Sequence, residues 1–247
     1  MGKPMSYASA AGTYASHRWA LAWKLEPLLT VAAGLGAQAE IAEAGCGTGD
    51  YVLALHDRFP GHRYRGFDVS PEMLARAREQ CPWAVSLDLA DANEAFPAGT
   101  GQLDFVYAVD VLHHLERYPQ FFAEAARVLG RGRALVVLTD SVEDILARSL
   151  AKFFPTTVPI NLERYPGIAE LETLAVEAGF RLASRRTVGG HIDLDGRFME
   201  ALASKALSEL RLISPEEHLA GLEQVRAAKA RGSQWLSQTT ALTWSRM

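Results

Sequence analysis

Three glycines at alternate positions follow a short apolar run that ends in an acid, within the stretch IAEAGCGTGD from Ile41 to Asp50. Gly45, Gly47 and Gly49 allow a sharp turn and let the backbone approach a ligand closely, because no Cβ stands in the way. A helix-like segment begins at Tyr51, and the free N–H groups at a helix start attract anionic or polar groups. This order predicts a nucleotide-sized binding site, although such a turn can also be purely structural.

A second acid lies where the next strand is expected to end. Asp68 follows the alternating segment 62–67, and Ser70 and Pro71 can begin a helix directly after it. Asp68 comes 19 residues after Gly49, a distance that suits one helix and one strand. A carboxylate at this place can accept hydrogen bonds from both hydroxyls of a ribose, and the alternative is that Asp68 simply ends a strand.

Two adjacent histidines follow a segment that is apolar enough to be a strand buried on both faces, 103–109. Histidine titrates near neutral pH, so His113 or His114 could act as a general base toward an acceptor that must lose a proton. A structural or shielding role is the alternative for at least one of them. The two cysteines, Cys46 and Cys81, form neither a disulfide framework nor a metal-ligand cluster, and no metal site is expected.

Composition limits the partners. The chain has 247 residues, with 25 basic and 29 acidic side chains and a net charge of −4, so a nucleic-acid partner is not expected. We find no basic-then-apolar leader and no apolar run near 20 residues, so we expect no membrane association and a cytoplasmic location. The length suits one large domain or one domain with a cap.

Strand-like and helix-like segments alternate, which predicts an α/β fold with a parallel sheet covered on both faces. We expect strands at 41–44, 62–67, 84–89, 103–109, 132–139, 180–188 and 233–245. We expect helices at 17–35, 51–58, 71–80, 118–129, 141–154, 168–178, 197–212 and 215–231, with an extended loop at 155–166. The predicted organisation is an N-terminal helical lid (1–36), a cofactor-binding core (37–140) and a C-terminal half (141–247) with cap insertions at 141–166 and 197–231.

Three motifs follow one another along the chain: Glu-x-Gly-x-Gly-x-Gly from Glu43, Gly-Phe-Asp-Val-Ser-Pro from Gly66, and Asp-Val-Leu-His-His-Leu from Asp110. Together they resemble the class I S-adenosylmethionine-dependent methyltransferases of the small-molecule, methyltransferase-11/25-like type. The resemblance implies S-adenosyl-L-methionine as cofactor. It also implies a Rossmann-like, doubly wound sheet of seven strands, with the last strand antiparallel between strands five and six, and a helical cap.

The same resemblance assigns roles to individual residues. Gly45 and Gly47 would pack under the methionine part of the cofactor, and Glu43 would orient its ammonium group. Asp68 would hold the ribose. The other cofactor contacts that the resemblance implies are Met73 on the adenine face, Asp91 and Ala92 at the adenine edge, Ala108 and Val109 along the sulfonium, and Cys46, Gly49 and Val69 in the two turns. Tyr14 and Arg18 are further candidates, near the carboxylate of the methionine part.

The sequence indicates the class of methyl acceptor less specifically than it indicates the cofactor. The sequence after the fourth strand, Ala-Val-Asp-Val, lacks the Pro-Pro-aromatic run that grips a planar amine, and no Pro-Cys pair follows for attack on a pyrimidine carbon. We therefore expect a small-molecule acceptor with an oxygen, nitrogen or carbon nucleophile, and Trp19, Phe154 and His191 are candidate substrate contacts. The alternatives are a protein or tRNA acceptor, a cofactor-binding protein without catalysis, and an oxidoreductase, which the glycine spacing disfavours. The chain is expected to be a monomer or a homodimer.

Overall fold

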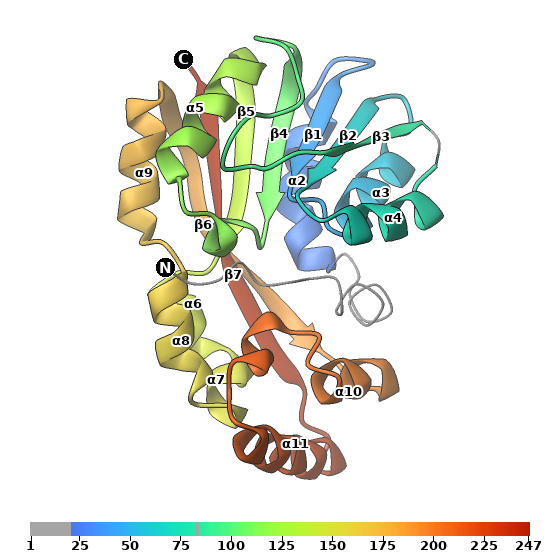
Figure 1. Cartoon of the computed structure of the whole chain (residues 1–247), viewed down its shortest axis with the longest axis vertical. Coiled ribbons are helices and arrows are strands. Elements are labelled where there is room, and N and C mark those ends of the chain that lie inside the picture. The colour runs from blue at the N-terminus through green and yellow to red at the C-terminus, as the bar shows by residue number, and fades with distance from the viewer. Residues whose placement is uncertain (1–20, 83) are drawn as a thin grey trace.

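The computed structural model describes residues 21–82 and 84–247, and its centre is one mixed sheet of seven strands (Figure 1). The strand order is β3-β2-β1-β4-β5-β7-β6, in which β7 runs antiparallel to both of its neighbours. This order confirms the predicted Rossmann-like fold with an antiparallel last strand between β5 and β6. The strands are β1 (Glu40–Ala44), β2 (Arg63–Asp68), β3 (Val85–Leu89), β4 (Leu103–Val109), β5 (Leu129–Thr139), β6 (Phe180–Ile192) and β7 (Trp235–Arg246).

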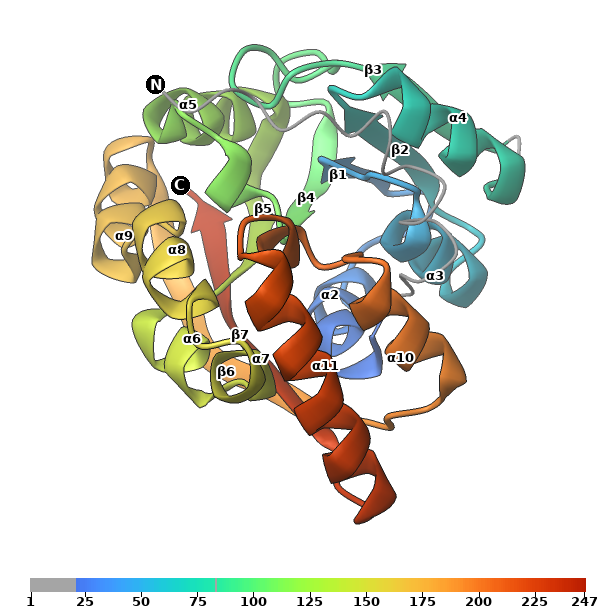
Figure 2. The same ribbon diagram turned by 60° about the horizontal axis from the view of Figure 1, so that its bottom comes forward.

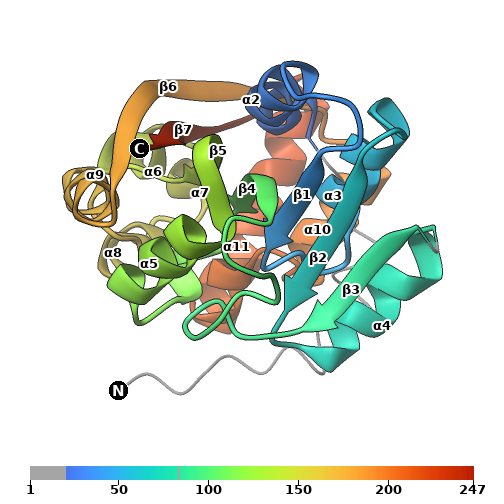
Figure 3. The same cartoon turned by 90° about the horizontal axis from the view of Figure 1, so that it is seen from above.

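Helices cover both faces of the sheet (Figure 3). On one face α5 and α9 pack over the strands, and on the other face α2 and α3 do so. The helices of the sheet half are α2 (Ala22–Ala33), α3 (Asp50–Arg58), α4 (Pro71–Gln80), α5 (Tyr118–Val128) and α9 (Ile168–Glu177). Those of the cap are α6 (Val142–Ala147), α7 (Ser149–Phe153), α8 (Thr157–Arg164), α10 (Gly196–Ala203) and α11 (Pro215–Ala230), with short 3-10 turns at η1 (Leu112–His114) and η2 (Ser208–Arg211).

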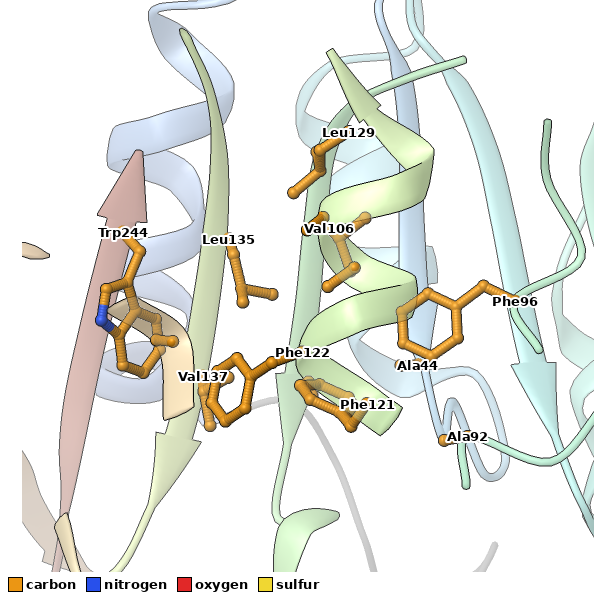
Figure 4. Close-up of a cluster of buried hydrophobic side chains, with 14 of the residues drawn as sticks. Ala44, Ala92, Phe96, Val106, Phe121, Phe122, Leu129, Leu135, Val137 and Trp244 are labelled. Carbon is orange, nitrogen blue, oxygen red and sulfur yellow. The ribbon is translucent and has the colours of Figure 1, made fainter. Parts of the chain in front are cut away.

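A cluster of buried hydrophobic side chains lies between α5 and the sheet. Phe121 and Phe122 of α5 are fully buried and point toward the sheet, where Phe122 meets Trp244 of β7 edge-on with ring centroids 5.6 Å apart (Figure 4). Burying a large aromatic side chain contributes on the order of 2–3 kcal/mol. This packing fixes the strands whose carboxyl ends carry the candidate site.

The cap lies beyond the carboxyl ends of the parallel strands, toward which the arrowhead of β4 points in Figure 1. Beyond β5, the residues Val188–Ile192 of β6 pair only with Trp235–Thr239 of β7, so the two strands continue as a ribbon into the cap. Figure 2 brings α7, α10 and α11 forward around this ribbon. Trp235 is buried in the cap core between Phe153 and Phe198, with ring centroids at 5.8 and 5.2 Å.

Several predicted boundaries differ from the structure. The segment 155–166 is not an extended loop, because it contains α8. Pro159 is the third residue of α8, where a helix needs no intrahelical N–H donor, so the proline does not prevent the helix. The single helix predicted at 141–154 is two helices that break at Arg148, whose backbone is extended (φ −67°, ψ 149°).

The other differences concern lengths. The predicted helix 197–212 ends at Ala203 and continues after a left-handed residue, Lys205, as η2. Strand β6 reaches Ile192 instead of residue 188, because pairing with β7 extends it into the cap. The first predicted helix, 17–35, corresponds to α2, which spans Ala22–Ala33. Residues 17–20 of that prediction lie outside the described residues.

Candidate active site at the junction of sheet and cap

The turn after β1 takes the shape that its glycines allow. Gly45, Gly47 and Gly49 have φ values of 68°, 52° and 84°, the left-handed region in which other residues are strained. A Cβ on Gly45 would lie 2.5 Å from Cγ2 of Val111, in the turn after β4. The turn is therefore a cradle that only glycine can form.

Asp68, at the end of β2, ties this turn to the next one. Its two carboxylate oxygens accept hydrogen bonds from the N–H groups of Gly47 (2.8 Å) and Ser70 (2.9 Å). Burial raises the pKa of Asp68, and the hydrogen bonds from the backbone oppose that rise. Each carboxylate oxygen can accept a further hydrogen bond, so Asp68 keeps the capacity to bind a ligand hydroxyl.

The two turns open into a cavity of about 560 Å³, which we call the rim cavity. This volume lies in the range of small-molecule and cofactor sites, about 300–1,000 Å³. The residues lining it are Gly45, Gly47, Asp68, Val69, Met73, Ala90, Asp91, Ala92, Asn93, Val109, Asp110, Val111, His114, Leu115, Glu116 and Arg117. Most of the residues that the sequence singled out for the cofactor are thus brought to one cavity.

The loop after β3 forms the far end of the rim cavity. One carboxylate oxygen of Asp91 accepts hydrogen bonds from the backbone N–H (2.8 Å) and the side-chain amide (3.0 Å) of Asn93. The side-chain oxygen Oδ1 of Asn93 in turn accepts hydrogen bonds from the backbone N–H groups of Glu116 (2.8 Å) and Arg117 (3.1 Å). This chain of contacts holds the loop in place, and Asn93 is a member that sequence reasoning missed.

Four residues predicted to contact the cofactor do not line the rim cavity. Glu43 is 2% exposed and accepts a hydrogen bond from the hydroxyl of Tyr107 (3.2 Å), and burial raises its pKa well above the usual value. Cys46 is buried, and its Sγ would lie 2.8 Å from a Cβ on Gly66. Gly49 and Ala108 are also set back from the cavity, Ala108 in the core under α5.

Asp110 stands at the junction of two cavities. It follows β4 with a left-handed φ of 56°, and its carboxylate accepts two hydrogen bonds from Nζ of Lys24 in α2 (2.7 and 2.5 Å). Both side chains are nearly buried, at 10% and 12% exposed. Left-handed backbone at a residue other than glycine costs about 1–2 kcal/mol, and such strain gathers at functional sites.

The second cavity lies between the strand ends and the cap, and we call it the cap cavity. It has a volume of about 130 Å³. The residues lining it are Leu21, Lys24, Tyr51, Asp110, His113, His114, Arg148, Leu150, Tyr165, Ile192, Phe198, Leu207, Ser208, Glu209, Trp235 and Ser237. Asp110 and His114 line both cavities, so the two are neighbours across one shared wall.

The two histidines occupy the 3-10 turn η1 directly after Asp110. Their ring centroids are 4.0 Å apart, and the ring of His113 stacks on Tyr165 at 4.3 Å and 20°. His113 lines the cap cavity only, whereas His114 lines both. The structure therefore separates two residues that the sequence could not tell apart.

The predicted substrate contacts are placed elsewhere. Phe154 is fully buried in the cap core, where its ring packs against Gly221 and stacks near His218, so it does not reach the cap cavity. His191 is an exposed residue of β6 and does not line the cavity either. Tyr14, Arg18 and Trp19 lie outside the described residues.

Sequence reasoning missed the charged part of the cap cavity. Lys24, Asp110, Arg148 and Glu209 come from four separate segments, and only Asp110 lay inside a recognised motif. Within residues 21–82 and 84–247, no group of three or more His, Cys, Asp or Glu side chains is arranged to hold a metal ion. In the same residues, no helix has the length and apolar character needed to cross a membrane.

Known proteins resemble this chain over the same region. Residues 41–132 match the family described as "Methyltransferase domain". A trans-aconitate 2-methyltransferase from Methylobacterium nodulans is 33% identical over 111 residues, which are 44% of this chain and 42% of that protein. A malonyl-[acyl-carrier protein] O-methyltransferase from Hahella chejuensis is 30% identical over 104 residues, 42% of this chain and 37% of that protein.

The chain thus spans about two fifths of the length of these curated relatives. Among solved structures, the geranyl diphosphate C-methyltransferase of Streptomyces coelicolor A3(2) shares the fold, with a TM-score of 0.57 and 18% identity. That likeness covers 91% of this chain and 78% of that one. Together with the sheet order and the glycine turn, the family match identifies residues 41–132 as a methyltransferase domain.

Proposed function

We propose that this protein transfers the methyl group of S-adenosylmethionine to a small-molecule acceptor bound in the cap cavity. The observation that carries the proposal is the shared wall: Asp110 and His114 line both the rim cavity and the cap cavity. A cofactor in the one and an acceptor in the other would meet there. The curated relatives are named for trans-aconitate and for malonyl-[acyl-carrier protein], and both names contain that of a carboxylic acid.

The residues of the rim cavity suit this cofactor. Gly45 and Gly47 line the rim cavity where the methionine part would lie, and the carboxylate of Asp68 has free acceptor capacity for the ribose hydroxyls. Buried Met73 and the loop at Asp91 and Ala92 lie where the adenine would go. When bound, the cofactor supplies an electrophilic methyl group: the S–CH3 bond breaks as the acceptor–CH3 bond forms, and the sulfur keeps the electron pair.

The protein's own part is to hold the acceptor in line and to keep water away, which can lower a barrier by several kcal/mol. The cap cavity is walled by apolar side chains such as Phe198 and Trp235. His114 is the histidine placed to take a proton from the acceptor, because it lines the shared wall. His113, stacked on Tyr165, has a positioning role.

Two measurements test the proposal. In thermal-shift titrations, S-adenosylhomocysteine raises the melting temperature and NADH does not; the reverse result would identify a dinucleotide enzyme instead. Methyl-labelled S-adenosylmethionine is then incubated with a panel of small carboxylic acids, phenols and amines, and labelled products are detected by mass spectrometry. Labelling of protein or tRNA in the absence of any labelled small molecule would refute the small-molecule acceptor.

The role of His114 has its own test. His114→Gln lowers kcat and removes a limb from the pH–rate profile, while the affinity for S-adenosylhomocysteine stays within about twofold. His113→Gln leaves the shape of that profile unchanged. An unaltered profile in the His114 variant would exclude it as the base.

A further inference from the structure

Arg148 is placed in the cap cavity by the break between α6 and α7. Its extended backbone ends one helix and begins the next, and its side chain turns inward, only 11% exposed. One amino group of the guanidinium, Nη1, donates a hydrogen bond to Asp140 directly after β5. Burial would lower the pKa of Arg148, but the Asp140 carboxylate raises it, so the guanidinium stays charged.

Within the described part of the chain, the opposite edge of the same guanidinium makes no hydrogen bond of good geometry, although Tyr165 also lies near the guanidinium. Nε and Nη2 are buried, and among the residues that the structure describes neither donates a hydrogen bond of acceptable geometry. These two N–H groups point the same way and form the fork that binds both oxygens of a carboxylate. A buried donor without an acceptor costs about 1–3 kcal/mol, and more when the group is charged.

Glu209 of η2 lies beside this edge of the guanidinium but accepts no hydrogen bond from it. Its Oε1 lies 4.0 Å from Nη2, beyond hydrogen-bond distance, and its other oxygen accepts from its neighbour Ser208 (3.2 Å). Glu209 is itself 8% exposed, so a second charge is buried with incomplete pairing. A carboxylate therefore already stands near the fork, but at the wrong distance.

We propose that the fork of Arg148 binds a carboxylate group of the methyl acceptor, and that this carboxylate takes the place of Glu209. The inference rests on the proposed function and names the class of acceptor. In the cap cavity the carboxylates of Asp140 and Asp110 already pair with Arg148 and Lys24. An acceptor carboxylate that replaces the Glu209 carboxylate beside Arg148 would leave the net charge next to the fork unchanged.

The size and walls of the cavity narrow the acceptor further. At about 130 Å³ the cap cavity has room for about four water-sized groups at about 30 Å³ each, which suits a short carboxylic acid. Phe198, Trp235 and Leu150 provide an apolar wall for its carbon chain. A planar carboxylate matches both N–H groups of the fork in one plane.

The competing amine acceptor makes an opposite prediction. An ammonium group would bind Glu209 and be repelled by Arg148, whereas a carboxylate would bind Arg148 and be repelled by Glu209. Substituting the two residues separately therefore distinguishes the two classes of acceptor.

The experiment measures ligand binding to the full chain saturated with S-adenosylhomocysteine. The probes are trans-aconitate, malonate, succinate and their methyl esters, with inorganic phosphate and ethanolamine as other chemistries. We expect at least one free carboxylate to bind, and its ester, phosphate and ethanolamine to bind at least tenfold more weakly.

The variants then assign the contact. Arg148→Lys keeps the charge beside Asp140 but loses the fork, so it weakens carboxylate binding at least tenfold while the affinity for S-adenosylhomocysteine stays within twofold. Glu209→Gln removes the competing charge and tightens carboxylate binding several-fold. Arg185→Lys, at a half-exposed surface pair with Glu172, is the matched control and changes neither affinity.

Three results would overturn the inference: no carboxylate binds although S-adenosylhomocysteine does, Arg148→Lys binds carboxylates as the parent chain does, or Glu209→Gln weakens them. Failure of S-adenosylhomocysteine itself to bind would instead refute the proposed function. The two failures are thus separate readouts of the same titrations.

Discussion

Replacing Gly45 with alanine tests the cradle directly. The added Cβ would lie 2.5 and 2.9 Å from the two methyl carbons of Val111, closer than such atoms are found in proteins. The backbone would also have to keep a φ of 68° with a side chain present. Both effects act at the wall of the rim cavity, which Gly45 and Val111 share.

The magnitude follows from three contributions. Left-handed backbone at alanine costs about 1–2 kcal/mol. Overpacking against Val111 costs about 1–3 kcal/mol. Alanine also stabilises by restricting the unfolded chain, by about 0.4–1 kcal/mol. We therefore expect a net loss of about 1–5 kcal/mol, which lowers the melting temperature by roughly 2–20 °C in a protein of this size.

The assay is urea unfolding of the single variants and of the double variant with Val111→Ala. The double variant relieves the collision but not the backbone strain, so a coupling of about 1–3 kcal/mol is expected between the two sites. Gly61→Ala is the control, since nothing lies within 4 Å of a Cβ there. The reasoning fails if Gly45→Ala matches this control to within 0.5 kcal/mol, or if the coupling is absent.

Three further changes test other parts of the molecule. Lys24→Met removes the cation beside Asp110 and is expected to cost about 2–5 kcal/mol in urea unfolding, because a nearly buried charge loses its partner. Glu43→Gln is expected to gain stability relative to the parent chain as pH rises. Burial raises the pKa of Glu43 in the folded state above its value of about 4.5 in the unfolded chain. The stability that the protonated Glu43 contributes in the parent chain is therefore present below about pH 4.5 and is lost as pH rises through the raised pKa. Gly221→Ala places a Cβ 2.3 Å from Cε1 of Phe154 and is expected to cost about 1–2 kcal/mol, despite the better helix propensity of alanine.

Each of these has a distinguishing control. Lys24→Arg keeps a cation and should retain most of the stability that the methionine variant loses. For Glu43, unfolding is compared at pH 4.5 and pH 8, and an equal effect at both would contradict the assigned cause. Gly196→Ala, where nothing lies within 4 Å of the Cβ, should not destabilise the cap as Gly221→Ala does.

The rim cavity could be predicted from the sequence because its signals are local. Left-handed backbone at Gly45, Gly47 and Gly49 favours glycine, and a carboxylate at the end of β2 is recognisable from the strand before it and the helix cap after it. Glu43 shows the limit of such reasoning. Its side chain turns into the core toward Tyr107, because that residue lies in the neighbouring strand β4, and no short motif records a contact across strands.

The cap cavity could not be predicted in the same way because its residues converge from distant segments. The break at Arg148 interrupts an otherwise helical pattern, and its reason lies in Asp140 at the end of β5 and in Glu209 across the cap. The burial of Phe154, a predicted substrate contact, could not be read from the sequence for a related reason. An aromatic side chain suits a cavity wall and a core equally, and only the approach of Gly221 in α11 decides for the core.

The ribbon of β6 and β7 joins a long segment of the cap to the sheet. Ile192 and Trp235 are direct partners across the ribbon, so the whole stretch from 193 to 234 leaves and returns at one point. Every residue of the rim cavity lies between Gly45 and Arg117 and belongs to neither that stretch nor the ribbon. The stretch from 193 to 234 can therefore change in sequence without altering any residue that lines the rim cavity.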